Sequence, residues 1–398
     1  MALGSAQKRC KYSAFIVSFT IFSVLLCYIF DKKFSMKHLL SICLLLFINY
    51  NIDAQLVKGY DVDEYRECLC MASHFSRQKL DSIYMSPKPS HSERLYASPI
   101  VAFENMWELW RINDSDTYVV SLRSSVPTLV SWMANFHAAM IPARGHINIG
   151  RGYDYDFSSD TLAHVHAGWT AGACMLLDDI TPKLDSLYRI GARDFIITGH
   201  SQGGALCYLV TAALIRMQQK GVFPLDIRIK SYSSAAPKPG DYPFAVWYEH
   251  YTAGWAINVI NADDWVPEVP LSEQLLADFR PTNPFANIGA LTDQMSAKDR
   301  FKMKFLLRRL NKPTRKSERA LRKYLGKSVG GMLESDIKGY KMPEFSVCAN
   351  YARCGITYVL MPDADYHSRH PYVAQDAFEH HMFGAYYELT FSPQNLKK

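Results

Sequence analysis

The sequence lacks the cysteine and histidine spacings that mark zinc-binding proteins. None of its nine cysteines belongs to a Cys-x-x-Cys pair, and no cluster of cysteines and histidines has the spacing of a structural zinc site. With 21% charged and 48% hydrophobic residues, the chain also lacks the composition of a disordered protein. We therefore expect 398 residues folded around one large core or two smaller ones, with no metal or nucleotide cofactor.

A general excess of positive charge is absent too. The net charge is +6, but residues 298–327 hold thirteen lysines and arginines and only two acids, so this segment carries +11 and the rest of the chain −5. No nucleic-acid recognition motif accompanies the basic segment, and we expect no nucleic-acid partner. Basic residues on an amphipathic helix favour an anionic membrane surface, and a solvated decoration is the alternative.

Two long apolar runs lie near the N-terminus, at residues 12–30 and 36–55. The second run begins with Met36 and basic residues, continues through an apolar core, and has the small residue Ala54 near its end, as secretory signals do. We expect a signal peptide ending near residue 55, a candidate translation start at Met36, and export to the periplasm, the cell surface or the medium. Two transmembrane helices or one signal anchor are the alternatives, although both runs lie near the lower length limit of a span.

Six cysteines lie beyond residue 55, where export would permit disulfides. Cys348 and Cys354 have the spacing of a small disulfide-closed loop, whereas Cys68 and Cys70 are too close together to pair comfortably. Cys207 lies in a helical apolar stripe, so we expect it to be a buried thiol.

Strand patterns alternate with helical patterns through the middle of the chain. Apolar residues recur at helical spacing within residues 158–191, a stretch that ends at Gly191, and again within residues 202–219; residues 128–140 are a further helix candidate. The strand patterns lie within residues 116–125, 194–199, 227–241 and 255–270. Such alternation predicts an α/β fold with a mostly parallel central sheet flanked by helices.

One stretch, FIITGHSQGGALCYLV at residues 195–210, passes from a strand pattern to a helical pattern with no loop between. Its centre matches Gly-x-Ser-x-Gly, in which a strained strand-to-helix turn exposes a serine hydroxyl. The helix that follows directs backbone N–H groups and its positive dipole end at the same point. Ser201 is therefore the candidate nucleophile and the Gln202 N–H a candidate oxyanion donor, with a glycine-rich packing turn as the alternative.

A serine nucleophile needs a base and an orienting acid, which follow it in the order acid, histidine in α/β-hydrolase-like folds. Asp263 and Asp264 end a strand pattern and precede Val266, which makes them the candidate acids. The candidate bases are the histidines of the C-terminal region: His367, His370, His380 and His381.

Six short motifs, in order, resemble those of the class 3 lipases, the family of fungal triacylglycerol lipases and their bacterial relatives. They are LRSS at 122–125, SWMANF at 131–136, VHAGW at 165–169, TGHSQGGALC at 198–207, SSAAPKPGD at 233–241 and NADDWVPEVP at 261–270. The resemblance implies an α/β-hydrolase fold and an exported hydrolase of carboxylic esters, foremost those of acylglycerol lipids, that works without a metal or cofactor.

The resemblance also implies roles for individual residues. Ser201 would attack the ester carbonyl. Asp264 would be the triad acid because it stands two residues before Val266, as the family motif requires, and Asp263 would be its solvated neighbour.

For the oxyanion hole, the resemblance implies that Ser125 contributes its backbone N–H and hydroxyl beside the Gln202 N–H. Such a donor typically supplies about 3 kcal/mol of transition-state stabilisation. Ser124 stands where the family has glycine, which alters the shape of the hole. His166 and His200 would be structural histidines that form hydrogen bonds and do not act as bases.

The position of the catalytic histidine depends on the residue used to align the C-terminal motif. Alignment on Asp376 and the Phe-Gly pair at 383–384 favours His380, whereas alignment on Tyr386 favours His381. We take His380 as the first choice and His381 as the second.

The acid and the base are separated by residues 291–345, which the pattern predicts to be a basic helical insertion and a candidate cap over the acyl pocket. We expect a targeting region at residues 1–55 and a lipase-like domain made of residues 56–290 and 346–398. The rival functions are an esterase or phospholipase acting on another acyl ester, and a catalytically silent surface protein that binds lipid or the cell envelope.

Overall fold

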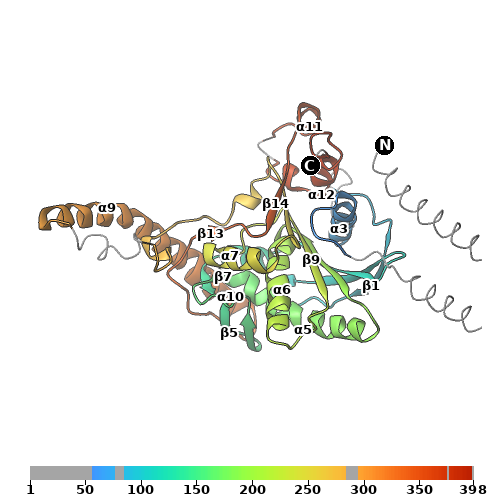
Figure 1. The fold of residues 1–398 in the computed structure, drawn as a ribbon, viewed down its shortest axis with the longest axis horizontal. Helices are drawn as coiled ribbons and strands as arrows, with labels where there is room; N and C mark the ends of the chain where they lie inside the picture. The colour runs from blue at the N-terminus through green and yellow to red at the C-terminus, as the bar shows by residue number, and fades with distance from the viewer. Residues whose placement is uncertain (1–55, 77–84, 284–294, 374–375, 397–398) are drawn as a thin grey trace, which may run out of the picture. The chain divides into compact units, whose positions relative to one another are not determined.

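A seven-stranded sheet forms the centre of the computed structural model, in the order β1-β2-β3-β8-β9-β11-β14 (Figure 1). Every neighbouring pair from β3 to β14 is parallel, while the pairs β1–β2 and β2–β3 are antiparallel, so the predicted mostly parallel α/β sheet is confirmed. The strands are β1 (Ser92–Ala97), β2 (Trp107–Ile112), β3 (Thr117–Leu122), β8 (Asp194–His200), β9 (Arg228–Ser234), β11 (Ala256–Asn261) and β14 (Ile356–Leu360). The structure describes residues 56–76, 85–283, 295–373 and 376–396. The predicted signal peptide lies outside them.

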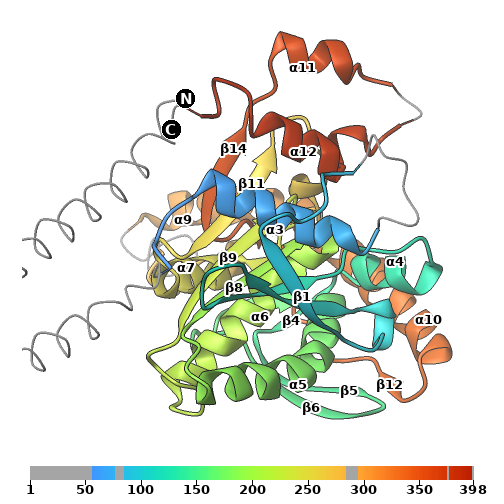
Figure 2. The same ribbon diagram turned by 90° about the vertical axis from the view of Figure 1, so that its right-hand side faces the viewer.

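Helices cover both faces of this sheet (Figure 2). Phe195 and Ile197 of β8 pack in one core cluster with α5 (Ala167–Arg189) and α6 (Gln202–Gln219), and Ile196 packs in a second cluster with α3 (Val62–His74) and α12 (Phe383–Leu389). A parallel strand covered on both faces carries a continuous apolar run, which explains the pattern of this stretch.

The two helices predicted before Ser201 are longer than the observed ones. The helix expected from residue 158 onward starts only at Ala167, because His164–His166 form strand β7, which pairs with β4 (Met140–Pro142). The helix candidate at residues 128–140 is the shorter α4 (Leu129–Phe136). The helix after Ser201 spans the expected residues.

Two smaller sheets flank the central one. The first has the order β13-β10-β7-β4 and brings together short strands from distant parts of the chain, with β10 at Gly240–Asp241 and β13 at Tyr351–Ala352. The second has the order β12-β5-β6, formed by Tyr340–Lys341, Arg144–Ile149 and Arg151–Asp156. Two further helices are α7 (Tyr242–Tyr251) and α11 (Ala364–Arg369).

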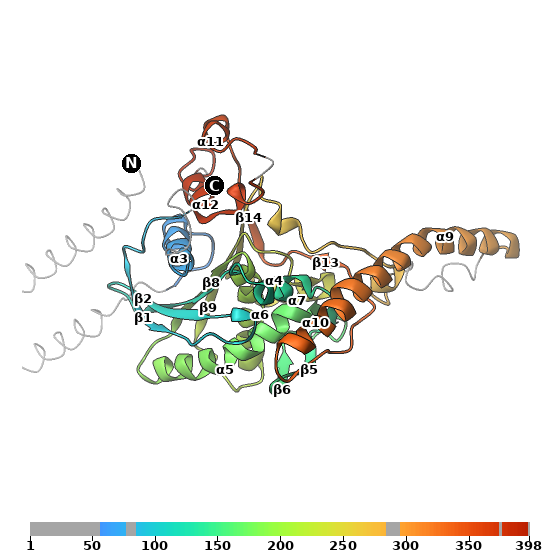
Figure 3. The ribbon, with the colours of Figure 1, turned by 180° about the vertical axis from the view of Figure 1, so that it is seen from behind.

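The basic segment is helical, as predicted. It consists of α9 (Ala297–Leu321), a π-helical turn at Arg322–Ser328 and α10 (Val329–Asp336), and Figure 3 shows α9 running away from the central sheet. Of the 25 residues of α9 only Leu307 and Glu318 are buried. Within the part of the chain that the structure describes, no helix is long and apolar enough to cross a membrane.

The six cysteines beyond residue 55 are all buried free thiols. The expected disulfide between Cys348 and Cys354 is therefore absent. Cys348 packs against Met140 in a small cluster of its own, while Cys354 belongs to the main core. The prediction that Cys207 is a buried thiol is confirmed.

Candidate active site

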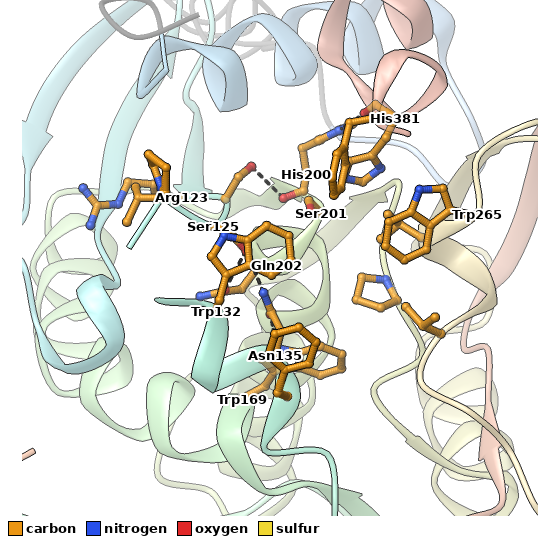
Figure 4. A pocket seen from close by; sticks show the side chains of 18 of the residues that line it. Arg123, Ser125, Trp132, Asn135, Trp169, His200, Ser201, Gln202, Trp265 and His381 are labelled. Carbon is orange, nitrogen blue, oxygen red and sulfur yellow. Dashed lines mark hydrogen bonds between the residues drawn. The ribbon is translucent and has the colours of Figure 1, made fainter. Parts of the chain in front are cut away.

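Ser201 lies at the end of β8 with φ 58° and ψ −124°, immediately before the first residue of α6 (Figure 4). Holding a non-glycine residue in such a conformation costs about 1–3 kcal/mol, so the surrounding contacts must maintain it. The two glycines of the motif allow those contacts. A Cβ atom on Gly199 would lie 2.3 Å from the backbone of Gly203, and a Cβ atom on Gly203 would lie 2.3 Å from the carbonyl oxygen of Leu122.

Asp264 follows β11 and is buried, and both of its carboxylate oxygens accept hydrogen bonds. Oδ2 accepts from the Nδ1 of His381 at 2.8 Å and from the hydroxyl of Tyr386 at 2.7 Å, while Oδ1 accepts from the N–H of Val266 at 2.9 Å. Burial and the charge of Asp264 raise the pKa of Tyr386 well above its usual value, so this hydroxyl remains a donor. A histidine whose Nδ1 proton is held in this way presents its Nε2 as a proton acceptor.

Of the four histidines considered as bases, only His381 contacts Asp264 among the described residues. The neighbouring His380, our first choice from the sequence, instead places its Nδ1 2.9 Å from the hydroxyl of Tyr366. The two histidines lie in a 3₁₀ turn at Glu379–His381, where successive side chains point about 120° apart. We therefore replace His380 by His381 as the candidate base.

The other candidates have partners elsewhere. His367 Nε2 lies 2.7 Å from Oδ2 of Asp263, the second candidate acid, so this aspartate forms a partly exposed hydrogen bond outside the site. His370 lies between Glu379 and Glu388, at 3.1 Å and 2.9 Å.

His200 and His166 are structural, as predicted. The Nε2 of His200 donates to the carbonyl oxygen of His381 at 2.7 Å, and its Nδ1 accepts from the hydroxyl of Ser234 at 3.0 Å. Burial, and then the charge of His381, lower the pKa of His200 well below its usual value, so this histidine is neutral and holds the turn that carries His381. His166 donates to the carbonyl oxygen of Asn135 at 3.1 Å, and burial lowers its pKa well below the usual value.

A polar network surrounds the expected oxyanion hole. The hydroxyl of Ser125 donates to the side-chain oxygen of Gln202 at 2.9 Å and accepts from the amide of Asn135 at 2.8 Å. The side-chain amide of Gln202 donates in turn to Asn105 at 3.0 Å. The backbone N–H of Gln202 belongs to the first turn of α6, where the helix itself offers no acceptor.

Ser124, which stands at the glycine position of the family motif, has a hydrogen-bonded side chain. Its hydroxyl donates to the carbonyl oxygen of His200 at 2.8 Å, so it joins the oxyanion turn to the strand that carries the nucleophile. Two residues of the site received no role from the sequence, although both lie in stretches used for the resemblance: Asn135, which positions Ser125, and Tyr386, which holds Asp264.

Ser201, His381, Ser125 and Gln202 line a cavity of about 530 Å³, within the usual size range of ligand sites (Figure 4). No hydrogen bond joins Ser201 to His381 among the described contacts, and in substrate-free enzymes this contact is often long. The remaining wall is largely apolar: it includes Trp132, Phe136, Trp265, Leu271, Leu325 and Phe378. Leu325 comes from the π-helical turn, so the basic insertion contributes to the cavity wall. A nucleophile, a base, an acid and oxyanion donors around an apolar cavity are the parts that acyl transfer requires.

Comparison with known proteins points to one family. The profile of the family described as lipase (class 3) matches residues 119–274. A protein named secreted mono- and diacylglycerol lipase 3, from Gibberella zeae, is 28% identical over 188 residues, which are 44% of this chain and 55% of the relative. The chain thus spans about half the length of the curated relative that it matches.

Solved structures with some similarity are fungal lipases. The Rhizomucor miehei lipase propeptide complex is 17% identical with a TM-score of 0.39, over 52% of this chain and 63% of that one. Lipase II from Rhizopus niveus is 18% identical with a TM-score of 0.38, over 52% of this chain and 74% of that one. The fold assignment rests on the order and direction of the strands in this chain, not on these likenesses. Residues 119–274 thus resemble the class 3 lipases, the family whose profile they match.

Proposed function

We propose that the protein is an exported serine hydrolase that cleaves carboxylic esters of acylglycerol lipids through Ser201, His381 and Asp264. The main support is the hydrogen bond between His381 and Asp264 in the wall of the apolar cavity that also exposes Ser201 at its strained turn. The acylglycerol substrate and the export are suggested by the name of the Gibberella zeae relative, a secreted mono- and diacylglycerol lipase.

In the proposed reaction, the Nε2 of His381 takes the hydroxyl proton of Ser201 while the serine oxygen attacks the ester carbonyl carbon. The Gln202 N–H and Ser125 stabilise the oxyanion. The bond to the leaving alcohol then breaks as His381 returns the proton to that oxygen, which leaves an acyl-enzyme. Water, deprotonated by the same histidine, releases the fatty acid and restores the serine.

The cavity wall favours an acyl chain over a carbohydrate, because tryptophan, phenylalanine and leucine offer few hydrogen bonds. Each methylene buried there contributes about 0.8 kcal/mol, which corresponds to about a fourfold increase in kcat/KM for each added carbon until the cavity is filled. An esterase for short chains and a phospholipase are the alternatives, and they differ from the proposal in chain length and head group.

The test is hydrolysis of p-nitrophenyl esters of increasing chain length, then of mono-, di- and triacylglycerols and phospholipids, by the wild type and Ser201→Ala. We expect long-chain and acylglycerol hydrolysis that falls at least about 10⁴-fold in the variant. Activity confined to short chains or to phospholipids would replace the substrate proposed here. A folded protein that hydrolyses none of these esters, or whose activity survives Ser201→Ala, would contradict the proposed function.

The helix α9 supports a second part of the proposal, contact with an anionic lipid surface. Phe301 and Phe305 are 73% and 53% exposed, and their spacing of four residues places them on one side of the helix. Lys302, Arg308 and Lys312 flank them on the same side. Basic residues near an anionic bilayer contribute about 1 kcal/mol each, and exposed aromatic rings insert at the interface, so the helix suits such a surface better than a neutral one.

Co-sedimentation with phosphatidylcholine vesicles, with and without phosphatidylglycerol, tests this contact. We expect binding only to the anionic vesicles, weakened by salt and reduced about tenfold or more by the double change Phe301→Ser and Phe305→Ser. Leu225→Ser, which removes another apolar side chain that is 77% exposed, is the matched control and should bind as the wild type does. Equal binding to neutral vesicles, or no effect of the phenylalanine changes, would contradict the membrane contact.

A further inference from the structure

Three side chains from distant parts of the sequence meet beside the small sheet β13-β10-β7-β4. His164 is the first residue of β7, Asp241 is the last residue of β10, and Cys348 lies three residues before β13. The first two are 77 residues apart and the last two 107 residues apart. One donor atom from each, the ring nitrogen, a carboxylate oxygen and the sulfur, lies within 4.8 Å of the other two.

The geometry of this cluster is already close to that of a metal site. The Nδ1 of His164 lies 2.8 Å from Oδ2 of Asp241, and the sulfur of Cys348 lies 3.8 Å from the same oxygen. Asp241 and Cys348 are buried, while the side chain of His164 is 25% exposed. The cluster therefore has a buried side that would hold an ion and one side open to solvent.

The Asp241 carboxylate is oriented so that one oxygen faces the other two side chains. Its Oδ1 accepts two backbone hydrogen bonds, from His164 and from Phe244 in the first turn of α7, both at 3.0 Å. These bonds leave Oδ2 directed at His164 and Cys348. Hydrogen bonds of this kind around a ligand carboxylate fix its orientation and increase metal affinity.

The charge around the cluster also favours a cation. Asp278 adds a second carboxyl group near Asp241 and His164. In the cluster itself, His164 is the only group that could carry a positive charge. A divalent ion between the ligands would offset this excess of acidic groups.

We propose that His164, Asp241 and Cys348 bind a zinc ion. Imidazole, carboxylate and thiolate together suit zinc better than magnesium or calcium, which take oxygen ligands only. Zinc would displace the thiol proton of Cys348 to solvent, while neutral His164 would bind the ion through Nδ1 and carry its proton on Nε2. Ligand atoms in tetrahedral zinc sites lie about 3.3–3.6 Å apart, so the pair at 2.8 Å opens by about half an ångström. Water on the exposed side of His164 completes the coordination.

The position of the site indicates a structural role. Cys348 lies where the chain returns from the basic insertion to the core, and Asp241 follows the loop whose Pro237 lines the active-site cavity. Zinc would link these two segments and β7, as a disulfide would in a protein with paired cysteines. The site would therefore stabilise the folded chain and the cavity wall without taking part in ester hydrolysis.

The test is zinc analysis of the full chain, purified without a polyhistidine tag. After incubation with zinc and dialysis, we expect one zinc per chain in the wild type, less than about one tenth in Cys348→Ser, and one in Cys354→Ser, which removes a buried thiol outside the cluster. Cobalt in place of zinc should give a thiolate charge-transfer band that Cys348→Ser abolishes. At a hundredfold excess over Kd, zinc should raise the Tm of the wild type by about 3–4 °C and leave that of Cys348→Ser unchanged.

Each outcome decides the proposal. Zinc at less than one tenth per chain in the wild type would show that the three side chains form only a hydrogen-bond cluster, and equal zinc in Cys348→Ser would place the ion elsewhere. His164→Gln provides a second test if Cys348→Ser does not fold, and it should also lose the metal. Ser201→Ala should bind zinc as the wild type does, so failure of the zinc site and failure of the proposed esterase function can be told apart.

Discussion

The sharpest test of the proposed triad compares two neighbouring histidines. His381→Ala removes the imidazole that contacts Asp264, and among the described residues the carboxylate keeps the hydroxyl of Tyr386 and the N–H of Val266 as donors. His380→Ala removes a side chain of the same kind one position earlier, whose described partner is the hydroxyl of Tyr366. The pair is a matched control, because the two changes are chemically identical and differ only in the direction of the side chain.

The expected sizes of the two effects follow from these contacts. Loss of a triad histidine lowers kcat by about 10⁴- to 10⁶-fold, which is about 5.5–8 kcal/mol of transition-state stabilisation. Loss of a single hydrogen bond to a tyrosine costs about 1 kcal/mol of folding stability and should leave kcat/KM within about threefold of the wild type. The two variants should therefore differ by at least about a thousandfold in rate.

The assay is kcat/KM for p-nitrophenyl butyrate, with circular dichroism and the thermal midpoint as controls for folding. A large loss in His381→Ala with near-normal activity in His380→Ala would support His381 as the base. The reverse result in two folded variants would refute the assignment. Equal and small losses in both would show that neither histidine is the base.

Three further predictions concern the same region. Tyr386→Phe removes one donor from Asp264 and should lower kcat/KM about tenfold in a folded protein, whereas an unchanged rate would show that the carboxylate needs no such support. Ser125→Ala removes the hydroxyl that links Asn135 to Gln202 around the oxyanion hole, and it should lower kcat about a hundredfold with little change in KM. Ser124→Gly, which restores the family glycine, should stay within about threefold, and equal effects would contradict the role given to Ser125. Burial lowers the pKa of His137 to about 4. As the pH drops, this histidine is therefore protonated in the unfolded chain before it is protonated in the folded protein, and the free energy of unfolding should fall by about 3 kcal/mol between pH 6.5 and pH 4. Urea unfolding of His137→Gln should show a smaller loss over this range, and an identical pH dependence in both proteins would contradict that pKa.

The parts of the site carried by contiguous residues could be predicted from the sequence. The turn at Ser201 needs only a strand, two glycines and a helix in immediate succession, and the structure has them at the expected residues. Asp263 and Asp264 were predicted as candidate acids because they come soon after a strand, and the resemblance to the class 3 lipases favoured Asp264. The start of α5 was misplaced because helical spacing extends back through residues that are instead paired in a small sheet.

The sequence could not decide between His380 and His381, because both fit the local pattern. Packing directs the side chain of His381 toward Asp264. Tyr386 proved the better anchor for alignment, since its hydroxyl and His381 bind the same carboxylate oxygen. The network around Ser125 likewise depends on Asn135 and Asn105, which the fold brings to it.

The sequence by itself determined the alternation of strands and helices, the nucleophile turn and the uneven distribution of charge, because each depends on neighbouring residues. Only the tertiary structure decided which histidine meets the acid, that Cys348 and Cys354 stay apart, and that His164, Asp241 and Cys348 come together. Residues that are 77 and 107 positions apart form no recognisable sequence motif, because the fold of the intervening chain decides whether their side chains meet.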